Sequence, residues 1–85
     1  MGDKANTVDI ELSKPITIDG AQVKALRMRE PTVGDQLAVD KMGGTDAEKE
    51  IATLAALCML KPADLHQLSL RDYKKVQAAY LGFLD

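Results

Sequence analysis

The sequence predicts an α+β fold: an N-terminal β-hairpin or small antiparallel sheet followed by three main α-helices. Apolar and polar residues alternate from Val8 to Leu12, which is the period of a half-buried strand. Farther along, three hydroxyl residues each precede an acid by three positions, a pattern typical of helix starts. The 85 residues are 46% hydrophobic, so the chain fits one globular domain. We expect residues 1–7 to form a flexible N-terminus and residues 8–85 to form a single domain.

The first strand is expected to be interrupted by Pro15, because proline cannot donate to a sheet and is confined to edge strands or bulges. Asp19-Gly20 is a signal for a tight hairpin turn. On the return strand the apolar positions change parity between Val23 and Leu26. We therefore infer a bulge near Lys24-Ala25 that keeps the apolar side chains of this strand on one face.

Three capping pairs mark the helical half. They are Thr32 with Asp35, Thr45 with Glu48, and Ser69 with Asp72. In each pair the hydroxyl can accept a hydrogen bond from a free amide, and the acid can reach back to the cap residue. The capping-box rule names Glu or Gln, so the two Asp pairs are expected to be weaker. These starts predict helices over residues 32–42, 46–60 and 70–83, the first ended by Gly43-Gly44, and a short helical turn at 62–67 after Pro62.

Catalysis and metal binding lack candidate residues. His66 is the single histidine and Cys58 the single cysteine. A functional interpretation pairs His66 with Cys58 or Asp64, but a surface polar histidine and a buried thiol fit the surrounding residues better. The acid-rich stretch 40–50 lacks the alternating ligands and central glycine of a calcium loop. We expect no enzymatic activity, no cofactor and no metal site.

Composition also argues against nucleic-acid and membrane partners. The net charge is −2, which offers no long-range attraction for nucleic acid or an anionic membrane. Arg71, Lys74 and Lys75 could form a small basic patch, but Asp72 dilutes it and no aromatic residue interleaves. The N-terminus has no signal-peptide pattern and the longest apolar run is too short to span a bilayer. We expect a protein of the cytosol. A small nucleic-acid-binding regulator is kept as an alternative function.

Apolar surface is the feature that remains. The run Ile51–Leu60 is apolar at every position but one, and a helix that is apolar all round must be covered on all sides. One interpretation places this helix centrally, between the hairpin and the last helix. The other exposes part of it, with the C-terminal apolar residues, to a partner or to another copy of the chain. The predicted partner-binding residues are Leu57, Met59, Leu60, Tyr80, Leu81 and Phe83.

Several strings in a fixed order carry a family resemblance. They are Leu12-Ser13-Lys14-Pro15-Ile16-Thr17-Ile18-Asp19-Gly20, then Arg29-Glu30-Pro31-Thr32-Val33-Gly34-Asp35, and finally Leu68-Ser69-Leu70-Arg71-Asp72-Tyr73. Their order and spacing resemble the tail assembly chaperones of Mu-like and related contractile-tailed phages, the small family called E, 41 or 14. The similarity extends from about residue 8 to residue 84. None of the strings is a chemical motif.

The resemblance implies a chaperone that binds the tape measure protein, a long and largely helical rod that sets tail length. Such a chaperone keeps the rod soluble in the host bacterial cytoplasm during tail assembly and is not expected in the mature virion. Self-association and a longer frameshifted form of the chain are further partners that the resemblance allows. A structural tail component is the alternative within the same setting.

The string from Arg29 to Asp35 has a structural interpretation. Pro31 forces Glu30 into an extended conformation, Thr32 caps the helix, and Gly34 lets the helix start lie close against the strand. Recognition of a partner is the alternative interpretation of this string.

Overall fold

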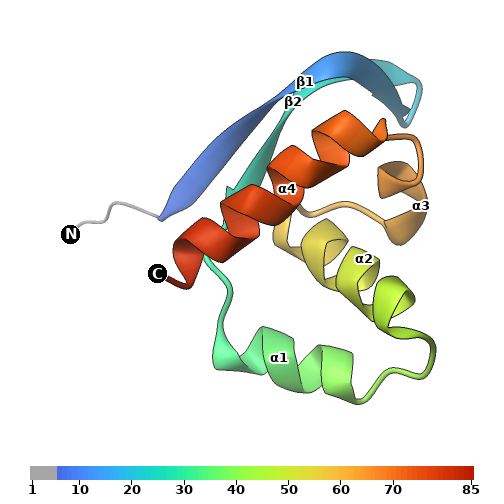
Figure 1. The fold of residues 1–85 in the computed structure, drawn as a ribbon. Helices are drawn as coiled ribbons and strands as arrows, with labels where there is room; N and C mark the ends of the chain where they lie inside the picture. The colour runs from blue at the N-terminus through green and yellow to red at the C-terminus, as the bar shows by residue number, and fades with distance from the viewer. Residues whose placement is uncertain (1–5) are drawn as a thin grey trace.

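The computed structural model describes residues 6–85 (Figure 1). Strands β1 (Thr7–Ile18) and β2 (Ala21–Arg29) form a two-stranded antiparallel hairpin. Four helices follow: α1 (Val33–Asp40), α2 (Asp46–Leu57), the short α3 (Pro62–Leu65) and α4 (Leu70–Phe83). The predicted α+β class, with a hairpin before three main helices, is confirmed. Residues 1–5 of the expected flexible N-terminus lie outside the described residues, and Thr7 already pairs with Arg29.

The hairpin turn has the predicted residues and geometry. Asp19 and Gly20 both have positive φ angles, 52° and 83°, as a two-residue type I′ turn requires. Ile18 pairs with Ala21 on either side of this turn. Asp tolerates the left-handed conformation better than most residues and Gly adopts it without a Cβ clash, so these two residues fix the turn.

The sheet is irregular beside Pro15, but on the other strand from the one predicted. Glu11 pairs with Ala25 and Ile16 pairs with Val23. Between these pairs lie residues 12–15 on β1 but only Lys24 on β2, so the additional residues belong to β1. The bulge expected in the second strand is therefore wrong in its location. Because β1 stays extended through Pro15, the proline interrupts the pairing and not the strand.

The helix starts follow the predicted caps, whereas two helix ends come earlier than predicted. Thr32, Thr45 and Ser69 are N-caps whose side chains accept from the backbone three residues later. Helix α1 ends at Asp40, before Gly43-Gly44, in a turn closed by a hydrogen bond from the Met42 amide to the Val39 carbonyl (3.1 Å).

Helix α2 ends at Leu57 and not at Leu60 because the chain turns left-handed at Met59 (φ 60°). The Leu60 amide donates to the Ala55 carbonyl (2.8 Å), and the Met59 amide donates to Ala56 (3.0 Å). These two bonds form a Schellman motif, in which the left-handed position normally holds glycine. Methionine in that position gave no sequence signal for the helix end.

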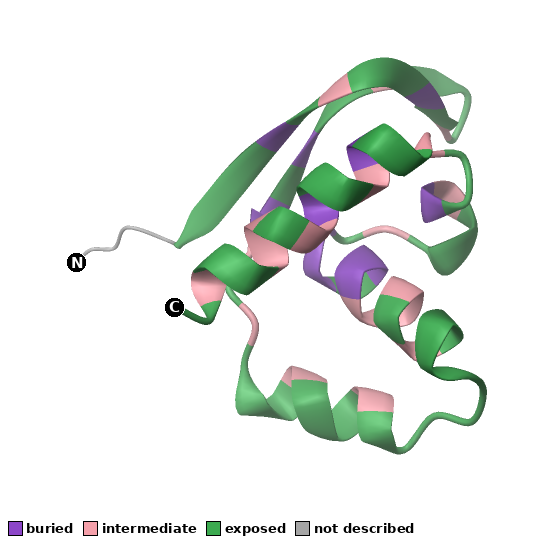
Figure 2. Ribbon diagram, in the orientation of Figure 1, coloured by how far each residue is buried: buried purple, intermediate pink, exposed green. Residues whose placement is uncertain are grey.

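The core lies between the inner face of the hairpin and helices α2, α3 and α4 (Figure 2). Helix α4 packs beside β1, and the end of α2 packs against β2. The buried apolar residues are Ile10, Ile16, Leu26, Met28, Leu54, Ala55, Leu57, Cys58, Leu65 and Val76. Helix α2 is therefore the central helix that one interpretation of its apolar sequence predicted. Helix α1 contributes no buried residue and contacts mainly α2.

Candidate protein-binding site

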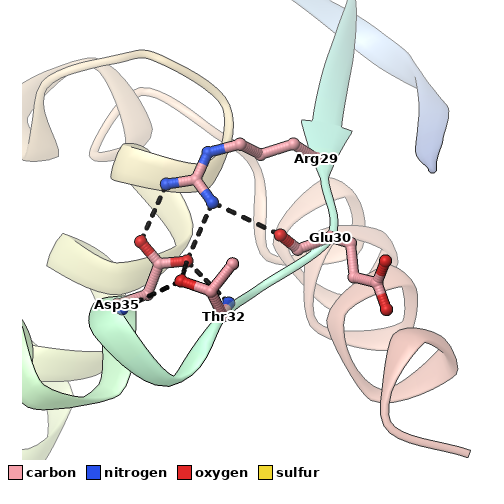
Figure 3. Close-up of polar contacts among 4 residues, drawn as sticks. All are labelled: Arg29, Glu30, Thr32 and Asp35. Carbon is pink, nitrogen blue, oxygen red and sulfur yellow. Dashed lines mark hydrogen bonds and ion pairs between the residues drawn. The ribbon is translucent and has the colours of Figure 1, made fainter. Parts of the chain in front are cut away.

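The junction between β2 and α1 is fixed by a paired arginine and aspartate (Figure 3). Arg29 donates two hydrogen bonds to the Asp35 carboxylate, each 2.8 Å long. The same carboxylate accepts from the Thr32 amide (2.8 Å) and hydroxyl (3.0 Å), and the Asp35 amide donates to the Thr32 hydroxyl (3.2 Å). Arg29 holds the pKa of Asp35 well below its usual range. A short aspartate thus completes a full capping box and also anchors α1 to the sheet.

Of the other residues in the Arg29–Asp35 string, Glu30 has a structural role, whereas Gly34 does not have the role expected of it. The Glu30 amide donates to the Asn6 carbonyl (3.0 Å), and the Asn6 side chain donates to the Glu30 carboxylate (2.7 Å), so Glu30 closes the open end of the hairpin. The expected role of Gly34 is wrong. A Cβ placed there would meet only the Thr32 hydroxyl at 3.6 Å, an ordinary contact, and nothing of the strand.

Asp72 joins the start of α4 to the bulge of β1. Its side chain is fully buried, and its carboxylate accepts from the Ser13 amide (2.9 Å and 3.1 Å), the Ser13 hydroxyl (3.0 Å) and the Lys14 amide (3.2 Å). The Ser13 amide is the main cause that lowers the pKa of Asp72. One of the two hydrogen bonds predicted for this cap is formed, because the Ser69 hydroxyl accepts from the Asp72 amide (3.2 Å). The carboxylate does not return to Ser69 but turns to β1.

The basic patch proposed for nucleic acid is partly used by the fold. Lys75 donates to the Glu11 carbonyl (2.9 Å) and lies 3.7 Å from the Asp72 carboxylate. Arg71 and Lys74 remain exposed. Lys75 therefore has a structural role in the fold, whereas Arg71 and Lys74 are presented to solvent without such a role.

A hollow of about 480 Å³ lies between α1, α2 and α4. Its lining combines apolar side chains with polar ones: Val39, Leu54, Tyr80 and Leu81 with Gln36, Asp46, Lys49, Glu50, Thr53 and Gln77. Glu50 accepts from the Tyr73 hydroxyl (2.7 Å) and from the Gln77 amide (2.6 Å), which ties α2 to α4 at this hollow. The Tyr73 hydrogen bond is the main cause that lowers the pKa of Glu50.

A second hollow of about 420 Å³ lies between β2 and the segment that follows α2. Its apolar lining is Ile18, Val23, Ala25, Leu26, Leu57, Cys58, Met59 and Leu60, with Thr7, Arg27 and Arg29 at its margin. Burial raises the pKa of the Cys58 thiol to about 11, so this cysteine acts as a small apolar residue. The hollow therefore offers apolar contact and no reactive group.

Five of the six predicted partner-binding residues line one of these two hollows, and Phe83 lines neither. Met59 is 88% exposed and Leu81 60% exposed, while Leu60, Tyr80 and Phe83 are half-buried. Leu57 is 1% exposed and belongs to the core, so its side chain is not available to a partner. Tyr80 and Leu81 line the first hollow, and Met59 and Leu60 line the second.

Sequence reasoning missed the exposed apolar side chains of α1 and its neighbouring turn. Val33 is 77% exposed, Leu37 56% and Met42 41%. Val33 and Leu37 stand four positions apart, which places them on one helical face. This four-residue spacing is the sequence signal for an apolar helix face, and the fold leaves that face exposed.

Two kinds of feature are not found among residues 6–85: a cluster of metal-ligating side chains and a membrane-spanning helix. Among residues 6–85 no group of three or more His, Cys, Asp or Glu side chains is arranged to hold a metal ion. Within the same residues no helix combines the length and apolar character needed to cross a bilayer. His66 is exposed, at the C-cap of α3.

Comparison with known proteins supports the resemblance found in the sequence. Residues 9–85 match the family described as phage tail assembly chaperone proteins, E, or 41 or 14. No match is found among curated proteins or among solved structures. The match covers the hairpin from Asp9 onward and all the helices, including the Arg29–Asp35 and Asp72 anchors. The chain belongs to the family of phage tail assembly chaperone proteins E, or 41 or 14.

Proposed function

We propose that this chain binds the tape measure protein of its phage and keeps that protein soluble while the tail assembles. Family membership gives the role in tail assembly. The observation that carries the finer proposal is the hollow between α1, α2 and α4, whose lining includes the half-buried Val39 and Tyr80 and the exposed Leu81. The proposed site of action is the host bacterial cytoplasm, and the chain is expected to be absent from the mature virion.

The lining of this hollow suits an amphipathic helix. Helix-in-groove recognition places apolar anchors on a groove floor and charged residues along its margins. Tyr80, Leu81 and Val39 supply apolar contacts, and Lys49 and Asp46 supply charges of both signs at the same hollow. A segment from a largely helical rod, with an apolar stripe flanked by charges, matches this arrangement.

The looseness of α1 supports binding of varied segments. No residue of α1 is buried, and its anchoring to β2 depends on the Arg29–Asp35 pair. An element with few buried contacts opens at low free-energy cost. The hollow can therefore widen by movement of α1 without disturbing the core. We retain Tyr80, Leu81 and Phe83 as proposed contacts with the rod and assign Leu57 to the core.

Co-expression with the tape measure protein of the same phage tests this proposal. Leu81→Asp is expected to reduce the soluble tape measure protein roughly tenfold, because a charge in an apolar contact is costly to desolvate. Leu70→Asp is the matched control: Leu70 is 78% exposed on the same helix but does not line the hollow. Both variants are expected to keep the circular dichroism spectrum of the parent chain.

Equal effects of the two substitutions, or no effect of Leu81→Asp in a folded chain, would contradict the assigned surface. Mass spectrometry of purified phage particles tests the proposed absence from the virion. Stoichiometric amounts of the chain in particles would support the structural-component alternative instead.

A further inference from the structure

The two outer edges of the hairpin differ in how their backbone groups are satisfied. Along β1, side chains from α4 and from the link between α3 and α4 occupy the outer edge. Gln67 accepts from the Thr17 amide (3.0 Å) and donates to the Thr17 carbonyl (2.8 Å). Asp72 accepts from the amides of Ser13 and Lys14, and Lys75 donates to the Glu11 carbonyl. This edge is closed to further strand pairing.

The outer edge of β2 has no such cover. The backbone groups of Thr17 and Glu11 that bond to Gln67 and Lys75 point away from β2. Gln22 and Ala25 lie opposite these two residues in the antiparallel pair, so their backbone N–H and C=O groups point away from β1. Because hydrogen-bonded and non-hydrogen-bonded pairs alternate along the ladder, the backbone groups of Arg27 and Arg29 also point away from β1. Within residues 6–85, no hydrogen bond other than those of the hairpin ladder reaches the backbone of residues 21–29. Natural proteins rarely leave a long strand edge unprotected, and a two-stranded sheet is marginal without a third strand or other cover.

An apolar hollow runs beside this open edge. It extends from Ile18 and Val23 to Arg29, and its other wall is the segment 57–60. Met59 stands on that wall, 88% exposed, in a left-handed conformation that presents its side chain to solvent. A strand added to β2 would direct every second side chain toward this hollow.

The charges on β2 indicate which side chains an added strand would carry on the face that points away from the hollow. Lys24, Arg27 and Arg29 lie on β2, and no acidic residue lies between residues 21 and 29. Asp9 and Asp35 engage Arg27 and Arg29, while no ion pair to Lys24 is found in the described part of the chain. A second copy added through β2 would bring another basic strand to this basic edge, which like-charge repulsion disfavours.

We propose that the open edge of β2 takes up an extended segment of a partner protein in which apolar and acidic residues alternate. Its apolar side chains enter the hollow beside Met59, and its acidic side chains face Lys24 and Arg27. The hairpin already contains one such pairing. β1 presents Val8, Ile10 and Leu12 alternating with acids, and Asp9 bonds to Arg27 at 2.9 Å. This edge is separate from the hollow proposed for the tape measure protein.

The test uses an acetylated and amidated peptide of sequence TVDIEL, copied from residues 7–12, titrated into the full ¹⁵N-labelled chain. The outward amides of Gln22, Ala25 and Arg27 are expected to shift and to exchange roughly tenfold more slowly with solvent. The Met28 amide, which bonds within the ladder, serves as the internal reference. A peptide with lysine at both acidic positions, TVKIKL, is expected not to bind.

Matched variants of the chain test the charge preference. Lys24→Glu is expected to weaken peptide binding roughly threefold. Lys74→Glu, the same charge change on the exposed face of α4, is expected to leave it unchanged. Absence of binding at millimolar TVDIEL would overturn the proposal, as would shifts confined to the α1–α2–α4 hollow. Protection of the same amides at high chain concentration without peptide would show a second copy as the occupant and would also overturn it.

Discussion

Helix α1 and the hairpin–α2–α4 body show two ways of holding a secondary-structure element. The body, together with the adjoining α3, buries ten apolar residues, three of which belong to α2. Helix α1 buries none and leaves Val33 and Leu37 in solvent. Polar bonds from Arg29 and Thr32 to Asp35 join one end of α1 to β2, and the helix also contacts α2. Apolar burial therefore stabilises the fold, while directional hydrogen bonds place a helix that contributes little to it.

This division bears on function because α1, the main helix without a buried residue, forms one wall of the hollow proposed for the tape measure protein. Mobile binding elements are commonly drawn from the least stable part of a domain. The opposite wall, formed by α2 and α4, is tied together by Glu50, Tyr73 and Gln77. We therefore expect the wall formed by α2 and α4 to move less than the wall formed by α1.

Truncating one leucine in each region gives the largest predicted difference in the free energy of unfolding. Leu54 is 2% exposed, and Leu54→Ala is expected to lower the free energy of unfolding by about 3 kcal/mol, since it leaves a cavity. Leu37 is 56% exposed, and Leu37→Ala is expected to change it by less than about 0.5 kcal/mol. Urea denaturation measures both. A similar loss for the two variants would show that α1 shares the core.

The buried carboxylate of Asp72 is expected to have the next largest effect. Asp72→Asn keeps the size of the side chain but sets an amide group against the donors of Ser13 and Lys14. The expected fall in Tm is roughly 10 °C. Asp64→Asn is the control, since Asp64 occupies the same helix position in α3 but accepts a single hydrogen bond, from the Lys61 amide (3.0 Å). A smaller fall for Asp72→Asn than for Asp64→Asn would contradict the anchoring role.

Acid is expected to destabilise the chain. The pKa values of Asp35, Glu50 and Asp72 are all lowered in the folded state, so the unfolded chain binds protons first as the pH falls. Their contribution is fully present above the unfolded values of about 4 and is lost as the pH drops through the lower folded values. Thermal melts between pH 7 and pH 2 are expected to show constant stability down to about pH 5 and a progressive decrease below it. Stability that rises on acidification would contradict the hydrogen-bond assignments.

Loosening α1 is expected to cost little global stability. Arg29→Gln removes the two bonds to Asp35 and is expected to lower the free energy of unfolding by about 1 kcal/mol or less. Hydrogen exchange in α1 is expected to quicken roughly tenfold, while exchange in α4 is unchanged. Arg27→Gln is the control, because Arg27 forms its exposed ion pair with Asp9 within the hairpin. Equal exchange changes in α1 and α4 would show that the two regions open together.

Local signals allowed much of the fold to be predicted from the sequence. Asp19-Gly20 specified the turn, and the residues at the three caps specified where the main helices begin. Each of these signals lies within a few positions of the structure that it determines. The helix ends were predicted less well, because α2 ends at a methionine in a conformation that usually selects glycine.

Features that depend on distant pairing could not be predicted. The acid at position 72 has the spacing of a capping residue, yet its carboxylate bonds to Ser13, fifty-nine positions away. Leu57 and Leu81 look alike in the sequence, although one is buried and the other exposed. Which strand carries the additional residues of the bulge also depends on pairing across the hairpin. Because the exposure of each apolar side chain depends on such distant packing, the sequence could not show which of the six predicted residues lie on one surface.

The smallest predicted effect concerns Met59, where the rigid body stores local strain. A non-glycine residue in the left-handed conformation is disfavoured, so Met59→Gly is expected to raise the free energy of unfolding by about 0.5–1 kcal/mol. The same substitution removes the exposed side chain beside the open edge of β2, and binding of the TVDIEL peptide is expected to weaken. Met42→Gly, at a position without a positive φ angle, is expected to give no gain in stability. A gain in stability joined to a loss of binding would mean that the methionine is kept for contact at a cost to the fold, whereas a loss of stability would refute the strain at this helix end.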